Sequence, residues 1–211
     1  MSAGTNWLQN SALQSLNTLY DTAIGSAKGM QATAEELADQ YRRKHVSVDD
    51  AVASLIRWQA AKTGATGFAT GLPGLIAMPV TLPADMTSLW YVQLRMVAAI
   101  ASLYGHDPRD EVVRTIAFYS LLGGGAIGAV SKTGVTIGNK TAMAALTRLP
   151  GHVLLRVNRL IGYRLVTKFG TKGVINLVKL VPIAGGVIGG TINAVGTNAT
   201  GKAAILLLRQ A

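Results

Sequence analysis

The C-terminal half of this chain carries no acidic residue. Residues 112–211 contain twelve Lys and Arg side chains and no Asp or Glu, whereas residues 1–111 contain eight basic and ten acidic side chains. The formal net charge of +10 therefore arises in one half of the chain. Because that half holds no counter-charge of its own, we expect its complement to be an anionic surface outside the chain.

Long uncharged stretches separate the basic residues and favour one kind of anionic partner. Residues 63–84 and 180–201 are each 22 residues long without a charge. A helix of 22 residues rises about 33 Å, close to the thickness of a bilayer's hydrocarbon core. Binding of nucleic acid usually requires stacking aromatic residues, which make up only 6% of this chain. The sequence predicts anionic membrane lipids as the partner and argues against nucleic acid.

The composition bounds the class of protein and its compartment. At 211 residues the chain can form one domain with a substantial core. Its mean hydropathy of +0.33 is high for a soluble protein but below that of a typical multi-span transporter. It contains no cysteine, and its first residues show neither the basic segment nor the apolar run of a secretory signal. We expect the protein at the cytoplasmic face of the membrane, in a peripheral or integral position.

Helical periodicity predicts an N-terminal arm followed by a larger domain. Apolar residues recur at intervals of three and four from residue 5 to about residue 44, which indicates an amphipathic helix. Ser47-Val-Asp-Asp50 matches the acidic variant of a capping box and predicts the start of a second helix. We assign residues 1–44 to the arm and 45–211 to a helical domain. The sequence leaves open whether the arm packs on that domain or reaches another subunit.

The remaining sequence also predicts helices, several of them interrupted by Gly and Pro. A helix should run from Pro83 to Gly105, and Asp107 with Pro108 should open the next. Two basic helices should follow Pro150, before a Gly-rich stretch at 182–201 and a short apolar turn. Strand signals are few. The predicted fold class is all-α, a helical bundle with Gly/Pro-broken apolar helices or helical hairpins.

Some glycines are spaced so that helices could approach closely. Small residues three or four positions apart let a second backbone pack on a helix, in water or in lipid. The predicted packing positions are Gly67, Gly71, Gly185, Gly186, Gly189 and Gly190. Pro73, Pro79 and Pro83 argue for a broken or hairpin path in the first group rather than a straight span.

Asp85 is an acid surrounded by apolar residues. As an early residue of the helix opened by Pro83, its carboxylate could accept backbone N–H bonds and interact favourably with the helix dipole. Alternatively, it forms a buried ion pair with Arg95 or with a base in the C-terminal half, because a buried acid needs a partner.

Basic residues just before, on and after the predicted helix at 152–169 are the candidate lipid contacts. These are Arg148, Arg156, Arg159, Arg164, Lys168, Lys172 and Lys179. At 100° per residue, Arg156 and Arg159 share one face, whereas Arg164 and Lys168 are rotated away by about 80–120°. A solvated helix face and a nucleic-acid surface are the alternatives to contact with anionic lipid.

Motifs for cofactors, metals and catalysis are weak. Gly123-Gly-Gly-Ala-Ile-Gly128 has the letters of a dinucleotide-binding loop but lacks the strand, the βαβ unit and the later acid that such a site needs. The three histidines form no metal-binding pair, so a metal site would require distant residues such as Asp85, His106 and Asp107. We predict no cofactor, no metal and no catalytic residue. A hydrolytic site near Asp85 and His106 is the enzymatic alternative.

Three stretches resemble the EcsC family of bacterial proteins. Residues 66–86, which contain Leu-Pro-Gly-Leu-Ile-Ala-Met-Pro, are followed by residues 93–107 in the same pattern, and residues 181–193 match the C-terminal signature. The resemblance spans roughly residues 45–205, and it extends more distantly to an apolar helical domain at the C-terminus of certain bacterial GTPases. It implies a helical, membrane-associated protein and supplies no catalytic residues.

These features lead to one functional prediction and one alternative. We predict a non-enzymatic, membrane-associated helical protein that contacts anionic lipid through its basic C-terminal half. The alternative is a soluble helical bundle with an apolar cavity that binds or transfers a lipid. A membrane protein partner and an oligomer are compatible with either.

Overall fold

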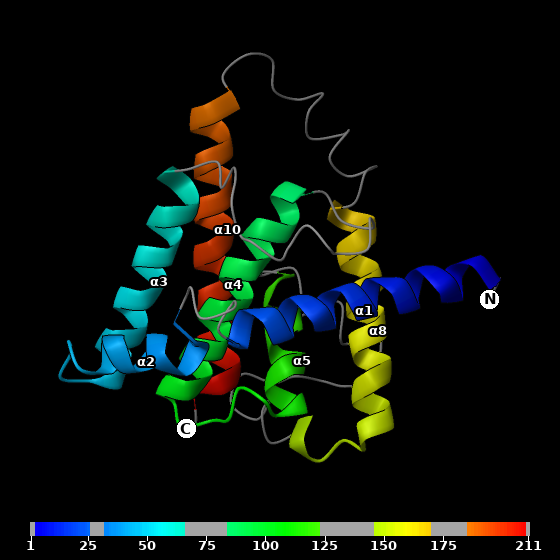
Figure 1. The fold of residues 1–211 in the computed structure, drawn as a ribbon, viewed down its shortest axis with the longest axis horizontal. Helices are drawn as coiled ribbons and strands as arrows, with labels where there is room; N and C mark the ends of the chain where they lie inside the picture. Colours follow the sequence, from blue (N-terminus) through cyan, green and yellow to red (C-terminus); the bar gives the residue numbers. More distant parts are fainter. Residues whose placement is uncertain (1–2, 26–31, 66–83, 123–145, 170–184, 210–211) are drawn as a thin grey trace.

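The described part of the chain consists of helices joined by turns and irregular segments, which confirms the all-α prediction. A computed structural model describes residues 3–25, 32–65, 84–122, 146–169 and 185–209, and these contain no strand. The helices are α1 (Ala3–Ile24), α2 (Ala34–Arg42), α3 (Val48–Ala65), α4 (Ala84–Leu103), α5 (Glu111–Ser120), α8 (Gly151–Phe169) and α10 (Gly185–Leu208). They pack into a helical bundle (Figure 1).

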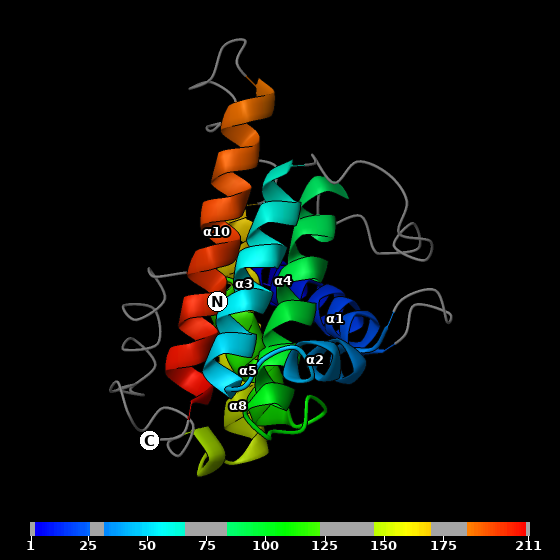
Figure 2. The same cartoon turned by 90° about the vertical axis from the view of Figure 1, so that its left-hand side faces the viewer.

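Helix α4 forms the centre of the bundle. Its 20 residues contain a run from Met96 to Ala101 in which every side chain is buried. A helix that is apolar on all sides must be covered on all sides. Accordingly α1, α2, α3, α5 and α10 all contact it, and Figure 2 shows α4 between α1 and α10. Gly105, with a φ of +86°, ends this helix in the left-handed conformation that glycine adopts readily.

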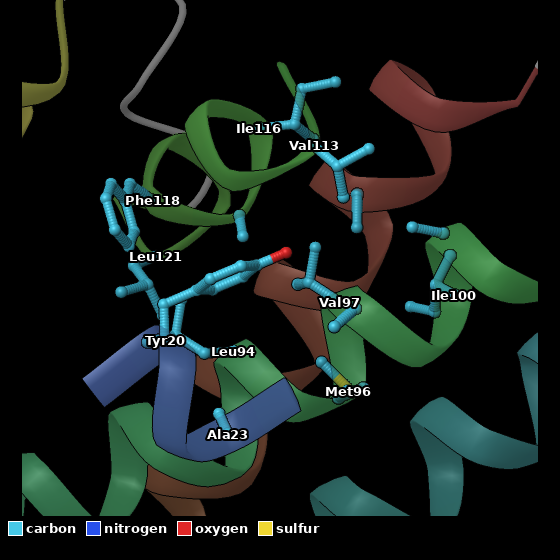
Figure 3. Packing of buried hydrophobic residues seen from close by; sticks show 14 of the residues in the cluster. Tyr20, Ala23, Leu94, Met96, Val97, Ile100, Val113, Ile116, Phe118 and Leu121 are labelled. Atoms are coloured by element: carbon cyan, nitrogen blue, oxygen red, sulfur yellow. The ribbon is translucent and has the colours of Figure 1, made fainter. Parts of the chain in front are cut away.

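Helix α1 packs on the rest of the bundle, which settles where the N-terminal segment lies. It crosses α8 and α4, and Tyr20 is fully buried between α1, α4 and α5 (Figure 3). The Tyr20 hydroxyl donates a hydrogen bond of 2.7 Å to the Pro108 carbonyl, and its ring meets Phe118 edge to face at 5.8 Å. Burial raises the pKa of Tyr20, so the hydroxyl keeps the proton that this bond requires.

The prediction of one continuous helix over residues 5–44 is wrong. The structure has α1 and α2 there, separated by residues 25–33. Helix α2 starts at a capping box: Glu36 N–H donates to the Thr33 hydroxyl at 3.1 Å, and Thr33 N–H donates to the Glu36 carboxylate at 2.8 Å. The Thr-x-x-Glu spacing was visible in the sequence, and it outweighs the apolar periodicity that continues through it.

The other predicted helix starts are confirmed in one case and shifted in another. Ser47 begins α3 as expected, with Asp50 N–H donating to its hydroxyl at 3.0 Å. Helix α5 does not start at Asp107 and Pro108, because the N-cap is Asp110, which accepts from Val112 N–H at 2.9 Å. Asp107 instead accepts from Arg109 N–H at 2.8 Å and closes the turn before the helix.

The Gly-rich stretch near the C-terminus is a continuous helix from residue 185 onward. We expected a Gly/Pro-broken helix or hairpin over residues 182–201 and then a separate apolar turn, but α10 runs unbroken for 24 residues. Packing against α3, α4 and α5 offsets the low helix propensity of its glycines.

Close packing at glycine occurs in the bundle, at positions other than those predicted. A Cβ on Gly201 of α10 would lie 2.7 Å from Cγ1 of Ile56 in α3, and a Cβ on Gly162 of α8 would lie 3.4 Å from Leu13 N in α1. Of the predicted positions, Gly67 and Gly71 lie outside the described residues. Gly185, Gly186, Gly189 and Gly190 lie in the first turns of α10, where their packing is not described.

Two substitutions in α10 test this packing with opposite expected signs. Gly201→Ala should destabilise the protein by roughly 1–3 kcal/mol, because the new methyl overlaps three side-chain atoms of buried Ile56. Gly196→Ala should instead stabilise it by about 0.5–1 kcal/mol, since its Cβ would be 3.9 Å from the nearest atom, in Gln93, and alanine favours the helix. Urea unfolding of both variants measures the difference, and equal effects would contradict the packing described.

Candidate functional site

The exposed side of α8 gathers basic residues and forms the candidate site. We define the α8 basic face as Arg148, His152, Arg156 and Arg159. Arg148, in the turn before the helix, is exposed, as are His152 and Arg156, and Arg159 is half-buried. Within the helix the residues follow one another at intervals of four and three, which places them on one side. Leu155, half exposed at 50%, lies four positions before Arg159 on the edge of this face.

The opposite side of α8 fixes the basic face in position. Leu154, Val157, Ile161 and Leu165 are buried, and the helix packs against α1 and α5. The close approach at Gly162 brings α1 against the same side. Because these buried residues recur every three or four positions, they form one stripe along the helix. The side of the helix opposite this stripe must therefore face outward.

The arginines of the basic face have no acidic partner in the described part of the chain. Every ion pair that the structure places there involves other bases. The Nε of Arg159 is also buried and meets no hydrogen-bond acceptor among the described residues. The exposed N–H groups of Arg148 and Arg156 can donate to an oxyanion outside the chain, and such charge-assisted hydrogen bonds are roughly twice as strong as neutral ones.

Acids of the N-terminal half neutralise some bases of the acid-free half, which our sequence analysis did not foresee. Arg114 pairs with Asp21 of α1 at 2.9 Å, and Arg209, after α10, pairs with Asp49 of α3 at 2.6 Å. Arg114 also lies over the Tyr20 ring at 5.3 Å. The expectation that this half lacks partners within the chain therefore fails for these two residues. It holds, among the described residues, for the α8 basic face.

Burial and Asp49 together raise the pKa of a neighbouring phenol, Tyr104. Tyr104 donates to Asp49 at 3.1 Å, and burial, this hydrogen bond and the negative charge of Asp49 together raise the pKa of Tyr104 to about 12. The positive charge of Arg209 acts in the opposite direction. Asp49 thus links α3, the end of α4 and the C-terminal end of the described chain.

Asp85 and His106 do not form a common site. Asp85 is the second residue of α4, whereas His106 follows the end of that helix, so about 30 Å of helical rise separates them. The His106 ring contacts the Leu208 carbonyl at 2.8 Å and caps the end of α10. A single hydrolytic or metal site that uses both Asp85 and His106 is therefore excluded by this distance.

Asp85 and Arg95 are not brought together as an ion pair. Ten residues of one helix place them about 15 Å apart along its axis, which is too far for the two side chains to bridge. Arg95 instead donates to the Ala32 carbonyl, ahead of α2. The side chain of Asp85 lies outside the described residues, so a role at the helix start stays a prediction.

The other predicted lipid contacts lie either on α8 away from the basic face or outside the described residues. Arg164 is half-buried on α8, rotated away from the basic face, and Lys168 lies in the last turn, where its side chain is not described. Lys172 and Lys179 lie outside the described residues.

A buried polar cluster was missed in the sequence. The Thr63 hydroxyl of α3 donates to the Thr197 hydroxyl of α10 at 3.0 Å, and Gln93 Nε2 of α4 donates to the same oxygen at 3.2 Å. All three side chains are buried, so these bonds satisfy polar groups at the meeting point of the helices. No local spacing pattern predicts this cluster, because Thr63 and Gln93 each lie more than a hundred residues before Thr197 along the chain.

Two other kinds of site are absent from the described ranges. Within the described ranges, no three His, Cys, Asp or Glu side chains gather as metal ligands would. None of the helices in these ranges combines the length and the apolar character needed to cross a bilayer.

The fold and the site define the protein as an all-α bundle with an exposed cationic helix face. Comparison with models of protein families, with curated proteins and with solved structures finds no match for this chain. The resemblance to the EcsC family stays a prediction.

The role of Asp49 can be tested by titration. Asp49→Asn removes the carboxylate charge while leaving the burial of Tyr104 unchanged, so the pKa of Tyr104 should fall from about 12 part of the way to its ordinary 10.0. Carbon NMR of the tyrosine ring measures this, with Tyr104→Phe assigning the signal. Asp39→Asn, at an exposed position of α2, is the control and should leave the Tyr104 pKa unchanged. An unchanged pKa in Asp49→Asn would contradict the contact.

Proposed function

We propose that this protein is a non-enzymatic, membrane-associated helical protein that binds acidic phospholipid through the α8 basic face, at the cytoplasmic side of the membrane. The observation that carries the proposal is the set of arginines on that face, Arg148, Arg156 and Arg159, which have no acidic partner among the described residues. Lipid phosphates supply the missing oxyanions.

The mixture of residues on this surface supports a membrane more than a nucleic acid. Leu155 is exposed beside Arg159, and aliphatic side chains next to cations fit a headgroup region. A nucleic-acid site would combine a basic track with aromatic residues on which bases stack. The resemblance to the EcsC family also supports the proposal, because it implies membrane association.

Electrostatics alone gives such a face useful affinity. Each basic residue near an acidic membrane surface contributes about 1 kcal/mol at physiological ionic strength, and the attraction decays within a Debye length of about 8 Å. Arg156 and Arg159 on the packed helix, with Arg148 in the turn before it, would together contribute about 3 kcal/mol, with little rearrangement of the helix.

Flotation with vesicles tests the proposal. The wild-type protein should float with vesicles of phosphatidylcholine and phosphatidylglycerol and stay behind with phosphatidylcholine alone. The triple variant Arg148→Gln, Arg156→Gln and Arg159→Gln should bind the acidic vesicles about 100-fold more weakly, given about 1 kcal/mol per residue.

A matched variant controls for net charge. Arg43, Lys44 and Arg57 are exposed but lie in the acid-bearing half of the chain, so replacing all three with Gln removes the same charge and should change binding much less. Equal loss in both variants would show a response to overall charge and would overturn the assignment to α8. Failure of the wild-type protein to float with any vesicle would overturn the proposed function. Binding to neutral vesicles as strong as to acidic ones would favour the alternative of a lipid carrier.

A further inference from the structure

Helix α10 presents an apolar face to the outside of the bundle. Its inner side packs against α3, α4 and α5, where Thr197, Thr200 and Gly201 are buried. On its outer side the large aliphatic residues Ile192, Val195 and Leu206 are 56%, 64% and 58% exposed. We define these three residues as the α10 outer face.

This face differs from that of an ordinary surface helix. A helix on the surface of a bundle usually turns charged residues outward. Helix α3 does so with exposed Arg57 and Lys62, whereas the only charged residue among the 24 of α10 is Lys202. The exposed side of α10 thus carries three large aliphatic residues and a single charge.

The position of α10 leaves this face accessible. Figure 2 shows the N-terminal end of α10 rising past the ends of α3 and α4, on the side of the bundle away from α1. Ile192 and Val195 lie in the half of the helix nearest that end.

We infer that the α10 outer face inserts among the lipids of the membrane to which the α8 basic face binds. Charge selects this occupant over a second copy of the chain. The half of the chain that carries the face holds no acid, so a symmetric contact would bring like charges together around Lys202. An acidic bilayer offers hydrocarbon to the aliphatic residues and phosphate to Lys202, whose long side chain can reach the headgroups. This inference rests on the proposed function, since insertion requires that the membrane be bound.

Resistance to salt separates insertion from purely electrostatic binding. High salt screens the contacts of the α8 basic face but does not weaken burial of aliphatic side chains. The wild-type protein bound to vesicles with phosphatidylglycerol should therefore partly survive a wash in 1 M salt. Ile192→Ser with Val195→Ser should still bind at low salt and be released completely by the wash. Full burial of one such side chain corresponds to roughly 10- to 100-fold in affinity.

A matched control uses other exposed aliphatic residues. Val46→Ser with Val48→Ser changes two exposed valines before and at the start of α3, in the acid-bearing half, and should leave salt resistance as in the wild type. Both double variants should unfold at the wild-type temperature, because the substituted side chains are at the surface.

The absence of native cysteine permits a direct measurement of insertion. Single cysteines at residues 192 and 195 can carry an environment-sensitive fluorophore, with a third at exposed Asp39 of α2 as reference. On acidic vesicles the labels on α10 should shift to shorter emission wavelengths and be quenched by lipid-borne quenchers, whereas the label at residue 39 should not change.

The outcomes distinguish the two proposals. If the protein floats with acidic vesicles but is released fully by salt and its α10 labels stay in water, insertion is refuted and binding through α8 stands. Emission shifts at residues 192 and 195 that appear without vesicles and grow with protein concentration would show a second copy on this face and also overturn insertion. If the protein does not float at all, both proposals fail.

Discussion

The need to cover α4 on every side is the constraint on which the rest of the structure depends. Its residues from Met96 to Ala101 are all buried, so no side of that helix segment can face water. Burying an aliphatic side chain stabilises the fold by about 1.5–3 kcal/mol, and this gain is available only if other helices surround α4 completely. Helices from both ends of the chain, including α1 and α10, are therefore drawn to one centre. This explains why the N-terminal segment is part of the bundle and not a separate arm.

The distribution of charge follows from this arrangement. The acids of the chain lie in its first half, and some of them meet bases from the second half where the helices converge, as in the pairs Asp21 with Arg114 and Asp49 with Arg209. Such partly exposed pairs contribute at most about 1 kcal/mol each, so they orient the helices more than they stabilise them. Arg42 acts similarly, donating to the Leu103 carbonyl at the end of α4 at 2.9 Å. The bases of the α8 basic face lie beyond the reach of described acids, which is why a local surplus of positive charge persists there.

The sequence predicted the fold class and several helix ends because these depend on local rules. Apolar spacing marked α8, and Ser47 and Gly105 marked one helix start and one helix end. Predictions failed where a longer-range contact or a competing cap decided the outcome. Asp110 and not Asp107 caps α5, and the glycines of α10 are helical because three neighbouring helices support them.

The candidate site was predictable only in part for the same reason. The spacing of Arg156 and Arg159 was enough to place them on one face, and the exposed positions agree with it. Whether a base finds an acid depends on tertiary contacts: Arg114 and Arg209 looked as unpaired in the sequence as Arg156 does, and only the packing of α1 and α3 separates them. The pairing of Asp85 with Arg95 failed on simple helix geometry, since residues ten apart in one helix cannot touch.

Helices α4 and α10 show why composition alone cannot distinguish a fully buried helix from one with an exposed apolar face. Both are strongly apolar, and from the sequence either could have faced lipid. The bundle buries α4 on all sides and α10 on one side only, because α10 packs at the edge with its small and polar residues inward, at Gly201 and Thr197. With these residues used for packing, the aliphatic residues Ile192 and Val195 are left outside. Water gives such an apolar face no favourable contact, whereas the hydrocarbon of a bilayer would cover it, as the proposed insertion requires.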